Sequence, residues 1–200
     1  METLLKNQES LRSISNIGQI GIVVHNINAA AAFYSTFFNV RKWYRSKMVK
    51  YDVVYRDQPV DIEWDIVVGY SGRLQVEVIK ILSGEQNIYH EVLGDNEGFH
   101  HFALMVNDLN KYLIGMNRGS LGFGGREVPK SLDRLHIDVL QRGTIHFAGG
   151  AVTQFAYLDT IPYCGFVIEL VETRLWGINL GMPEWLVSVG RLLGSTESLS

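Results

Sequence analysis

The chain has 200 residues, of which 46% are hydrophobic and 20% are charged. This composition is typical of a folded globular protein and excludes a disordered or low-complexity chain. The 18 Lys and Arg residues against 21 Asp and Glu residues give a net charge of −3 without any basic run, so we expect no nucleic-acid partner.

The N-terminal segment, residues 1–16, is polar and lacks the apolar core of a signal peptide. The longest apolar stretches have the length of strands, well short of the roughly 20 residues that a membrane span needs. The single cysteine, Cys164, excludes an internal disulfide and fits a reducing compartment. We therefore expect a cytoplasmic protein with no membrane partner.

Two pairs of segments repeat along the chain in the same order. Residues 19–28 are similar to residues 101–110, and a helical stretch follows each run. The short polar side chains of Asn28 and Asp108 are expected to cap these two helices. Residues 74–80 are similar to residues 166–172 and close the two copies. The repeat predicts a duplicated βαβββ module.

Two more strands fit inside each copy. Residues 40–45 and 61–70 are candidates in the first copy, and residues 153–159 are the clearest candidate in the second. No element is assigned within residues 119–150. Four glycines there indicate a loop rather than a phosphate-binding turn, because no clear strand precedes them: Gly119, Gly122, Gly124 and Gly125.

The expected organisation is one α+β domain over residues 17–172, built from two modules between two tails. Residues 182–194 are expected to form a short amphipathic helix within the second tail. The ranges are an N-terminal tail at 1–16, a first module at 17–82, a linker at 83–97, a second module at 98–172 and a C-terminal tail at 173–200.

The repeat brings four polar residues to matching places in apolar strands. Gln19 and His101 begin the two copies, and Glu77 and Glu169 end them. Buried carboxylates are costly unless they are paired or bound to a metal. A divalent cation would hold both of them together with one imidazole and one amide oxygen. Such a mixed set suits Zn, Mn, Ni, Co or Fe(II) and does not select among them.

Other side chains near these strands have weaker signals. His100 adjoins His101, but strand alternation directs it to the opposite face, where a structural role is expected. Aromatic residues occur in the elements around the expected site. We expect Trp64, Phe155 and Tyr157 to contact a hydrophobic substrate.

These segments resemble the vicinal oxygen chelate superfamily, which includes glyoxalase I, methylmalonyl-CoA epimerase, extradiol dioxygenases and bleomycin-resistance proteins. The resemblance implies two βαβββ modules that form a cupped mixed β-sheet around a metal. It also implies that the metal ligands are Gln19, Glu77, His101 and Glu169. Gln19 stands where the family usually has His. The matching segments are residues 17–24, 74–79, 97–106, 155–160 and 165–172.

By this resemblance, the chain is expected to be a glyoxalase-like isomerase, epimerase or lyase that works through a metal-stabilised enolate. Glu169 or Glu77 would act as the base. Gln19 in the first ligand position counts against dioxygenase chemistry, and no Arg or Lys set suggests a glutathione site. Family members are commonly homodimers, so a dimer is expected here. The alternatives are a non-catalytic binding or resistance protein of the same fold, and a purely structural subunit.

Overall fold

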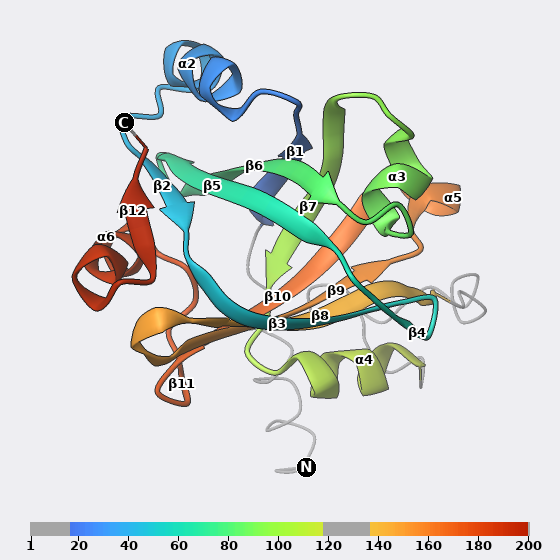
Figure 1. The fold of residues 1–200 in the computed structure, drawn as a ribbon. Helices are drawn as coiled ribbons and strands as arrows, with labels where there is room; N and C mark the ends of the chain where they lie inside the picture. The colour runs from blue at the N-terminus through green and yellow to red at the C-terminus, as the bar shows by residue number, and fades with distance from the viewer. Residues whose placement is uncertain (1–16, 118–136, 200) are drawn as a thin grey trace.

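The computed structural model describes residues 17–117 and 137–199 (Figure 1). Within these residues, two βαβββ modules form one curled mixed β-sheet, as the sequence predicts. The elements of the first module are β1 (Ile17–Val23), α2 (Ile27–Phe37), β2 (Trp43–Ser46), β5 (Glu63–Ser71) and β6 (Leu74–Ser83). Those of the second are β7 (Gly98–Met105), α4 (Leu109–Asn117), β8 (Val139–Phe147), β9 (Ala151–Leu158) and β10 (Val167–Leu175).

The two modules meet at the centre of the sheet. The strand order is β12-β2-β5-β6-β1-β7-β10-β9-β8-β3-β4, and β1 runs antiparallel to β7. The order includes three strands outside the modules: β3 (Met48–Tyr55), β4 (Gln58–Val60) and β12 (Thr196–Ser198). Within each module the first strand is parallel to the last, β1 to β6 and β7 to β10. The four central strands are therefore those that begin and end the two copies.

A hairpin that the sequence does not predict lies between β2 and β5. It consists of β3 (Met48–Tyr55) and β4 (Gln58–Val60). Only Lys47 separates β2 from β3, yet β2 pairs with β5 in the first module and β3 pairs with β8 in the second. The chain thus passes from one side of the curled sheet to the other (Figure 1).

The two faces of the sheet have different partners. Helix α2 covers the outer face of the first module, where Ile22, Val76 and Val78 pack against Ile27 and Ala31. Helix α4 covers the equivalent face of the second module, where Ala156 and Leu170 belong to its cluster. Strand alternation turns the other set of side chains into the cup, so the concave face can carry polar groups.

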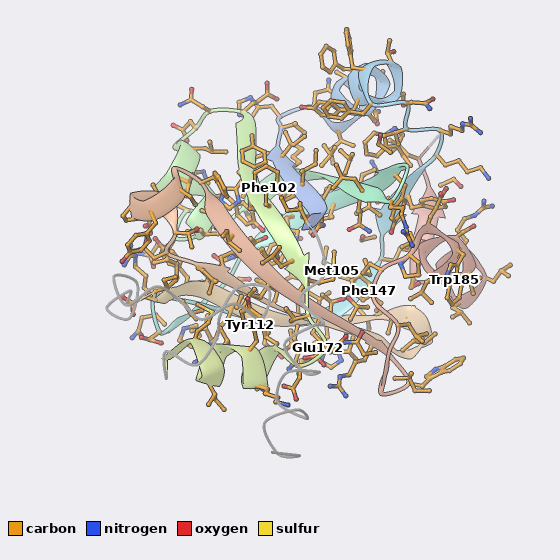
Figure 2. All side chains as sticks on the ribbon, turned by 180° about the vertical axis from the view of Figure 1, so that it is seen from behind. Phe102, Met105, Tyr112, Phe147, Glu172 and Trp185 are labelled. Atoms are coloured by element: carbon orange, nitrogen blue, oxygen red, sulfur yellow. The ribbon has the colours of Figure 1, made fainter. Side chains whose placement is uncertain are left out.

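Helix starts follow local capping chemistry. The cap of α2 is Asn26, whose Oδ1 accepts a hydrogen bond from Ala29 N at 3.1 Å, so the expectation for Asn28 is wrong by two residues. At α4, Asp108 Oδ1 accepts from Lys111 N as expected. Buried Glu172 adds a second acceptor, for Leu109 N at 2.7 Å, and lies beside α4 in Figure 2.

The remaining elements are short helices and strands outside the two modules. Residues 83–97, expected to be a linker, contain helix α3 (Ile88–Leu93). Helix α6 (Glu184–Leu193) buries Val187 and Gly190, while Trp185 is exposed on its outer side (Figure 2). The smaller elements are η3 (Ala148–Gly150), α5 (Ile161–Cys164), β11 (Ile178–Asn179) and β12 (Thr196–Ser198).

The loop glycines Gly119, Gly122, Gly124 and Gly125 lie outside the described residues. None of the helices in the described ranges is long and apolar enough to cross a bilayer.

Candidate metal centre

The four predicted ligands lie on four adjacent strands: Gln19 on β1, Glu77 on β6, His101 on β7 and Glu169 on β10. The pairing repeats between modules. In the first module Gln19 pairs with Gln75, and Glu77 follows Gln75 by two residues. In the second module His101 pairs with Val167, and Glu169 follows Val167 by two residues. The repeat therefore delivers all four side chains to the concave face.

Three of these side chains converge closely. One ligand atom from each of Glu77, His101 and Glu169 lies within 4.8 Å of the others. His101 Nε2 is 3.1 Å from Glu169 Oε2 and 3.6 Å from Glu77 Oε2. Gln19, which is also buried, lies close enough to Glu77 to oppose the rise in the Glu77 pKa. The Gln19 amide therefore lies at the edge of the cluster, beside one of its carboxylates.

The donor set fits a divalent cation. His101 is fully buried, and its Nε2 forms no hydrogen bond of acceptable geometry with any described residue, although two carboxylates flank it. Metal–nitrogen and metal–oxygen bonds of about 2.1 Å place neighbouring ligand atoms about 3.0 to 3.4 Å apart. The two distances from His101 Nε2 to the carboxylate oxygens, 3.1 and 3.6 Å, lie close to that range. One imidazole, two carboxylates and an amide suit Zn²⁺, Mn²⁺, Co²⁺, Ni²⁺ or Fe²⁺.

Without a cation, the cluster is electrostatically strained. Burial, and then the charge of Glu169, raise the pKa of Glu77 to about 7, while His101 and Gln19 oppose the shift. Burial alone would lower the pKa of His101, but Glu169 and Glu77 outweigh it and raise that pKa. The raised pKa values of Glu77 and His101 mean that these two residues keep protons that a metal would displace.

His100 lies beside His101, contrary to the expectation from alternation. The β1–β7 register passes from His101 directly to Phe99, so His100 is the extra residue of a β-bulge. Its Nδ1 is 3.0 Å from His101 Nδ1. Burial and then the neighbouring His101 lower the pKa of His100 to about 3, which keeps it neutral. A neutral His100 Nδ1 can accept the Nδ1 proton of His101 and leave His101 Nε2 free for a metal.

The cup around the cluster is narrow and mostly apolar. A cavity of about 60 Å³ borders Gln19, Glu77 and Glu169, and the expected substrate contacts Trp64, Phe155 and Tyr157 also line it. Since one water needs about 10 to 15 Å³ of such space, the cavity holds only a few waters. Met48 and Met182 form part of the wall, and methionine side chains adapt readily to a ligand.

Some residues of the site could not be found from the repeat. Tyr89 comes from α3, and its hydroxyl lies 2.9 Å from the Tyr157 hydroxyl. Its ring contacts the His100 ring at 4.7 Å between centroids. Gln75, by contrast, carried a signal, because it shares a strand face with Glu77 two residues away. An amide side chain such as Gln75 on the same strand face as Glu77 indicates a further polar group in the cup.

Sequence comparison gives one family match, to the model of the Glyoxalase/Bleomycin resistance protein/Dioxygenase superfamily over residues 18–118. No curated protein matches the chain.

Three similar solved structures each cover 80% of this chain. A hypothetical protein from Bacillus halodurans is 19% identical, is covered over 94% of its length and has a TM-score of 0.47. Methylmalonyl-CoA epimerase from Mycobacterium tuberculosis is 14% identical, with 88% covered and a TM-score of 0.46. A variant methylmalonyl-CoA epimerase from Streptomyces coelicolor, in complex with 2-nitronate-propionyl-CoA, is 17% identical, with 97% covered and a TM-score of 0.46.

Proposed function

The chain belongs to the glyoxalase/bleomycin resistance protein/dioxygenase superfamily, and we propose that it is a metal-dependent enzyme of the isomerase, epimerase or lyase type. Its substrate is a small carbonyl compound that binds in the cup. The observation that carries the proposal is the convergence of ligand atoms: the buried Nε2 of His101 lies 3.1 Å from a Glu169 oxygen and 3.6 Å from a Glu77 oxygen. These three residues would hold the metal, with Gln19 as a fourth, oxygen donor.

The proposed reaction begins with removal of a proton from the carbon beside the substrate carbonyl. A bound divalent cation would supply Lewis acidity, which polarises that carbonyl. Glu77 or Glu169 takes the proton, since both carboxylates border the cavity. Trp64, Phe155 and Tyr157 surround the substrate and exclude water from the reacting carbon. Return of the proton to another face or another carbon then gives epimerisation or isomerisation.

The donor set argues against the oxygenase branch of the superfamily. Non-haem Fe(II) oxygenases use two histidines and one carboxylate on one face of the metal. Here the converging groups are one histidine and two carboxylates, Glu77 and Glu169. Gln19 stands where a second histidine would complete the oxygenase triad. The cluster therefore favours proton transfer beside a carbonyl over oxygen activation.

The test combines metal content with exchange of carbon-bound protons. Protein purified without chelator is expected to contain near-stoichiometric metal, whereas Glu169→Ala protein is expected to contain little. In D₂O, proton NMR follows the α-protons of hydroxyacetone, pyruvate and a short acyl thioester. The metal-loaded protein should accelerate exchange for at least one of them, and Glu169→Ala should not.

Asp95→Asn serves as the control, because the Asp95 side chain is fully exposed and outside the cluster. It should retain both metal and exchange. Metal-free protein that binds these compounds tightly, without any exchange, would overturn the enzyme proposal in favour of a non-catalytic binding or resistance protein.

Metal affinity is expected to fall as the pH decreases. Below pH 7 the Glu77 carboxyl takes up a proton because its pKa is raised to about 7, and that proton must leave before the metal binds. Protonation of Glu77 alone predicts about tenfold weaker Zn²⁺ binding at pH 6 than at pH 8. Competition titrations with a chromophoric chelator at fixed ionic strength measure the affinity. Equal affinities at the two pH values would contradict this prediction.

Two broader expectations stay predictions. We propose that the protein works as a homodimer in the cytoplasm, in keeping with one free, exposed cysteine, Cys164. Light scattering on the eluting protein tests the dimer.

A further inference from the structure

The cavity wall contains a buried hydrogen-bond acceptor that no described residue satisfies. Gln75, on β6, is 1% exposed, and its side-chain oxygen Oε1 has no hydrogen-bond partner among the described residues. The same residue lines the cavity beside the metal cluster. Buried polar atoms are nearly always paired, so an unpaired one at a cavity wall points to a ligand or a bound water.

The orientation of this amide is fixed by a chain of hydrogen bonds. The Tyr70 hydroxyl donates to the carbonyl oxygen of Met182 at 2.9 Å, and a carbonyl can only accept. The Tyr70 oxygen must therefore accept from Gln75, whose Nε2 makes that contact. A flipped Gln75 would set its oxygen against the Tyr70 oxygen without a proton between them. Gln75 Oε1 is thus held as the atom left without a partner.

The position of Gln75 places this acceptor next to the proposed metal. Gln75 precedes Glu77 by two residues on the same strand face, and it is the register partner of Gln19. Residues i and i+2 on a strand are roughly 7 Å apart, and neighbouring strands are about 4.8 Å apart. A molecule whose carbonyl contacts the metal therefore reaches Gln75 with a group only a few bonds away.

We infer that Gln75 is a specificity-determining residue whose side-chain oxygen accepts a hydrogen bond from an O–H or N–H group of the substrate. The inference rests on the proposed function, because it takes the substrate carbonyl to lie at the metal. A ligand without the donor displaces water and leaves Gln75 Oε1 buried and unpaired, which weakens its binding. Simple ketones and esters are therefore discriminated against. The Tyr70–Met182 contact makes this selection depend on the segment that leads into α6.

The test uses two small chelating probes on Zn²⁺-loaded protein. Acetohydroxamate and N-methylacetohydroxamate offer the same two oxygens to a metal, but only the first has an N–H donor. Calorimetry is expected to show that the wild-type protein prefers acetohydroxamate by roughly tenfold or more. Gln75→Met keeps the length of the side chain and removes the acceptor, so it should abolish that part of the preference.

Tyr70→Phe gives a second, independent variant. It leaves Gln75 in place and removes the hydroxyl that orients it, so the preference should shrink while Zn²⁺ affinity stays unchanged. Tyr55→Phe is the matched control, since the Tyr55 hydroxyl contacts Glu91 instead. It should retain the full preference.

The outcomes separate the two proposals. If both probes bind and Gln75→Met has the same probe preference as the wild type, the inference is overturned and the proposed metal centre stands. If neither probe binds and Zn²⁺ does not bind either, the proposed function fails, and the inference fails with it.

Discussion

Glu77→Gln is expected to stabilise the metal-free protein and to abolish the stabilisation that a metal gives. In the metal-free protein at pH 8, Glu77 is ionised although burial and Glu169 oppose it, because they raise its pKa to about 7. A raised carboxyl pKa contributes stability that is present below the ordinary pKa and lost as the pH rises through 7. The neutral amide avoids this loss, so the free energy of unfolding at pH 8 should rise by about 1 to 3 kcal/mol.

With saturating Zn²⁺ the order should reverse. A metal at 1,000 times its Kd stabilises the wild type by about 4.1 kcal/mol, and a variant that lacks a ligand gains little of this. Urea denaturation with and without chelator, at pH 8 and pH 5, measures all four states. At pH 5 the metal-free proteins should be nearly equal, because Glu77 is then protonated.

The control is Glu91→Gln. Glu91 forms an ion pair with Arg56 at 2.6 Å near the surface, away from the cluster. Loss of the Glu91–Arg56 ion pair should change the free energy of unfolding by less than about 1 kcal/mol, and by the same amount with and without metal. A Glu77→Gln protein that is less stable than the wild type without metal would show that Glu77 serves as a structural partner of His101 instead.

The placement of the four predicted ligands could be read from the sequence because the repeat and strand alternation act together. Gln19 and His101 take equivalent places in two copies of one module, and so do Glu77 and Glu169. Strand pairing then carries this equivalence into space, since the first and last strands of each copy are neighbours. No single one of these residues is informative alone.

The sequence does not reveal features that depend on long-range pairing or on irregular backbone. The bulge that turns His100 toward His101 breaks the period-2 pattern at one residue. Strand β3 leaves its own module to pair with β8, and nothing local in Met48–Tyr55 specifies that partner. Tyr89 enters the cup from α3, within a segment expected to be a linker. The bulge, the β3–β8 pairing and the position of Tyr89 all depend on contacts between residues far apart in the sequence.

The sequence also indicates how the ligand side chains are accommodated. In both copies a small residue follows the first ligand by two positions, Gly21 after Gln19 and Ala103 after His101. The antiparallel β1–β7 pairing sets Gly21 opposite His101 and Ala103 opposite Gln19. Each small residue thus makes room for the ligand of the other module.

Gly21→Ala is therefore expected to displace the His101 imidazole. A Cβ atom at position 21 would lie 1.8 Å from His101 Cε1 and 2.3 Å from its Nε2. The ring cannot retreat easily, because it is fully buried and lies 5.2 Å from the Tyr157 ring between centroids. Overpacking of this kind costs about 1 to 3 kcal/mol of stability. Zn²⁺ affinity should fall by roughly 100-fold or more, because a ligand nitrogen leaves its place.

Two comparisons show whether the imidazole is the cause. Gly98→Ala, on the adjacent β7, meets only Leu93 at 3.6 Å and should leave both stability and Zn²⁺ affinity nearly unchanged. In a His101→Ala background, Gly21→Ala should cost much less stability than in the wild type, because the ring it strikes is gone. An equal cost in both backgrounds would mean that Gly21 is needed for the β1 backbone itself. A smaller cost would identify it as the residue that makes room for His101.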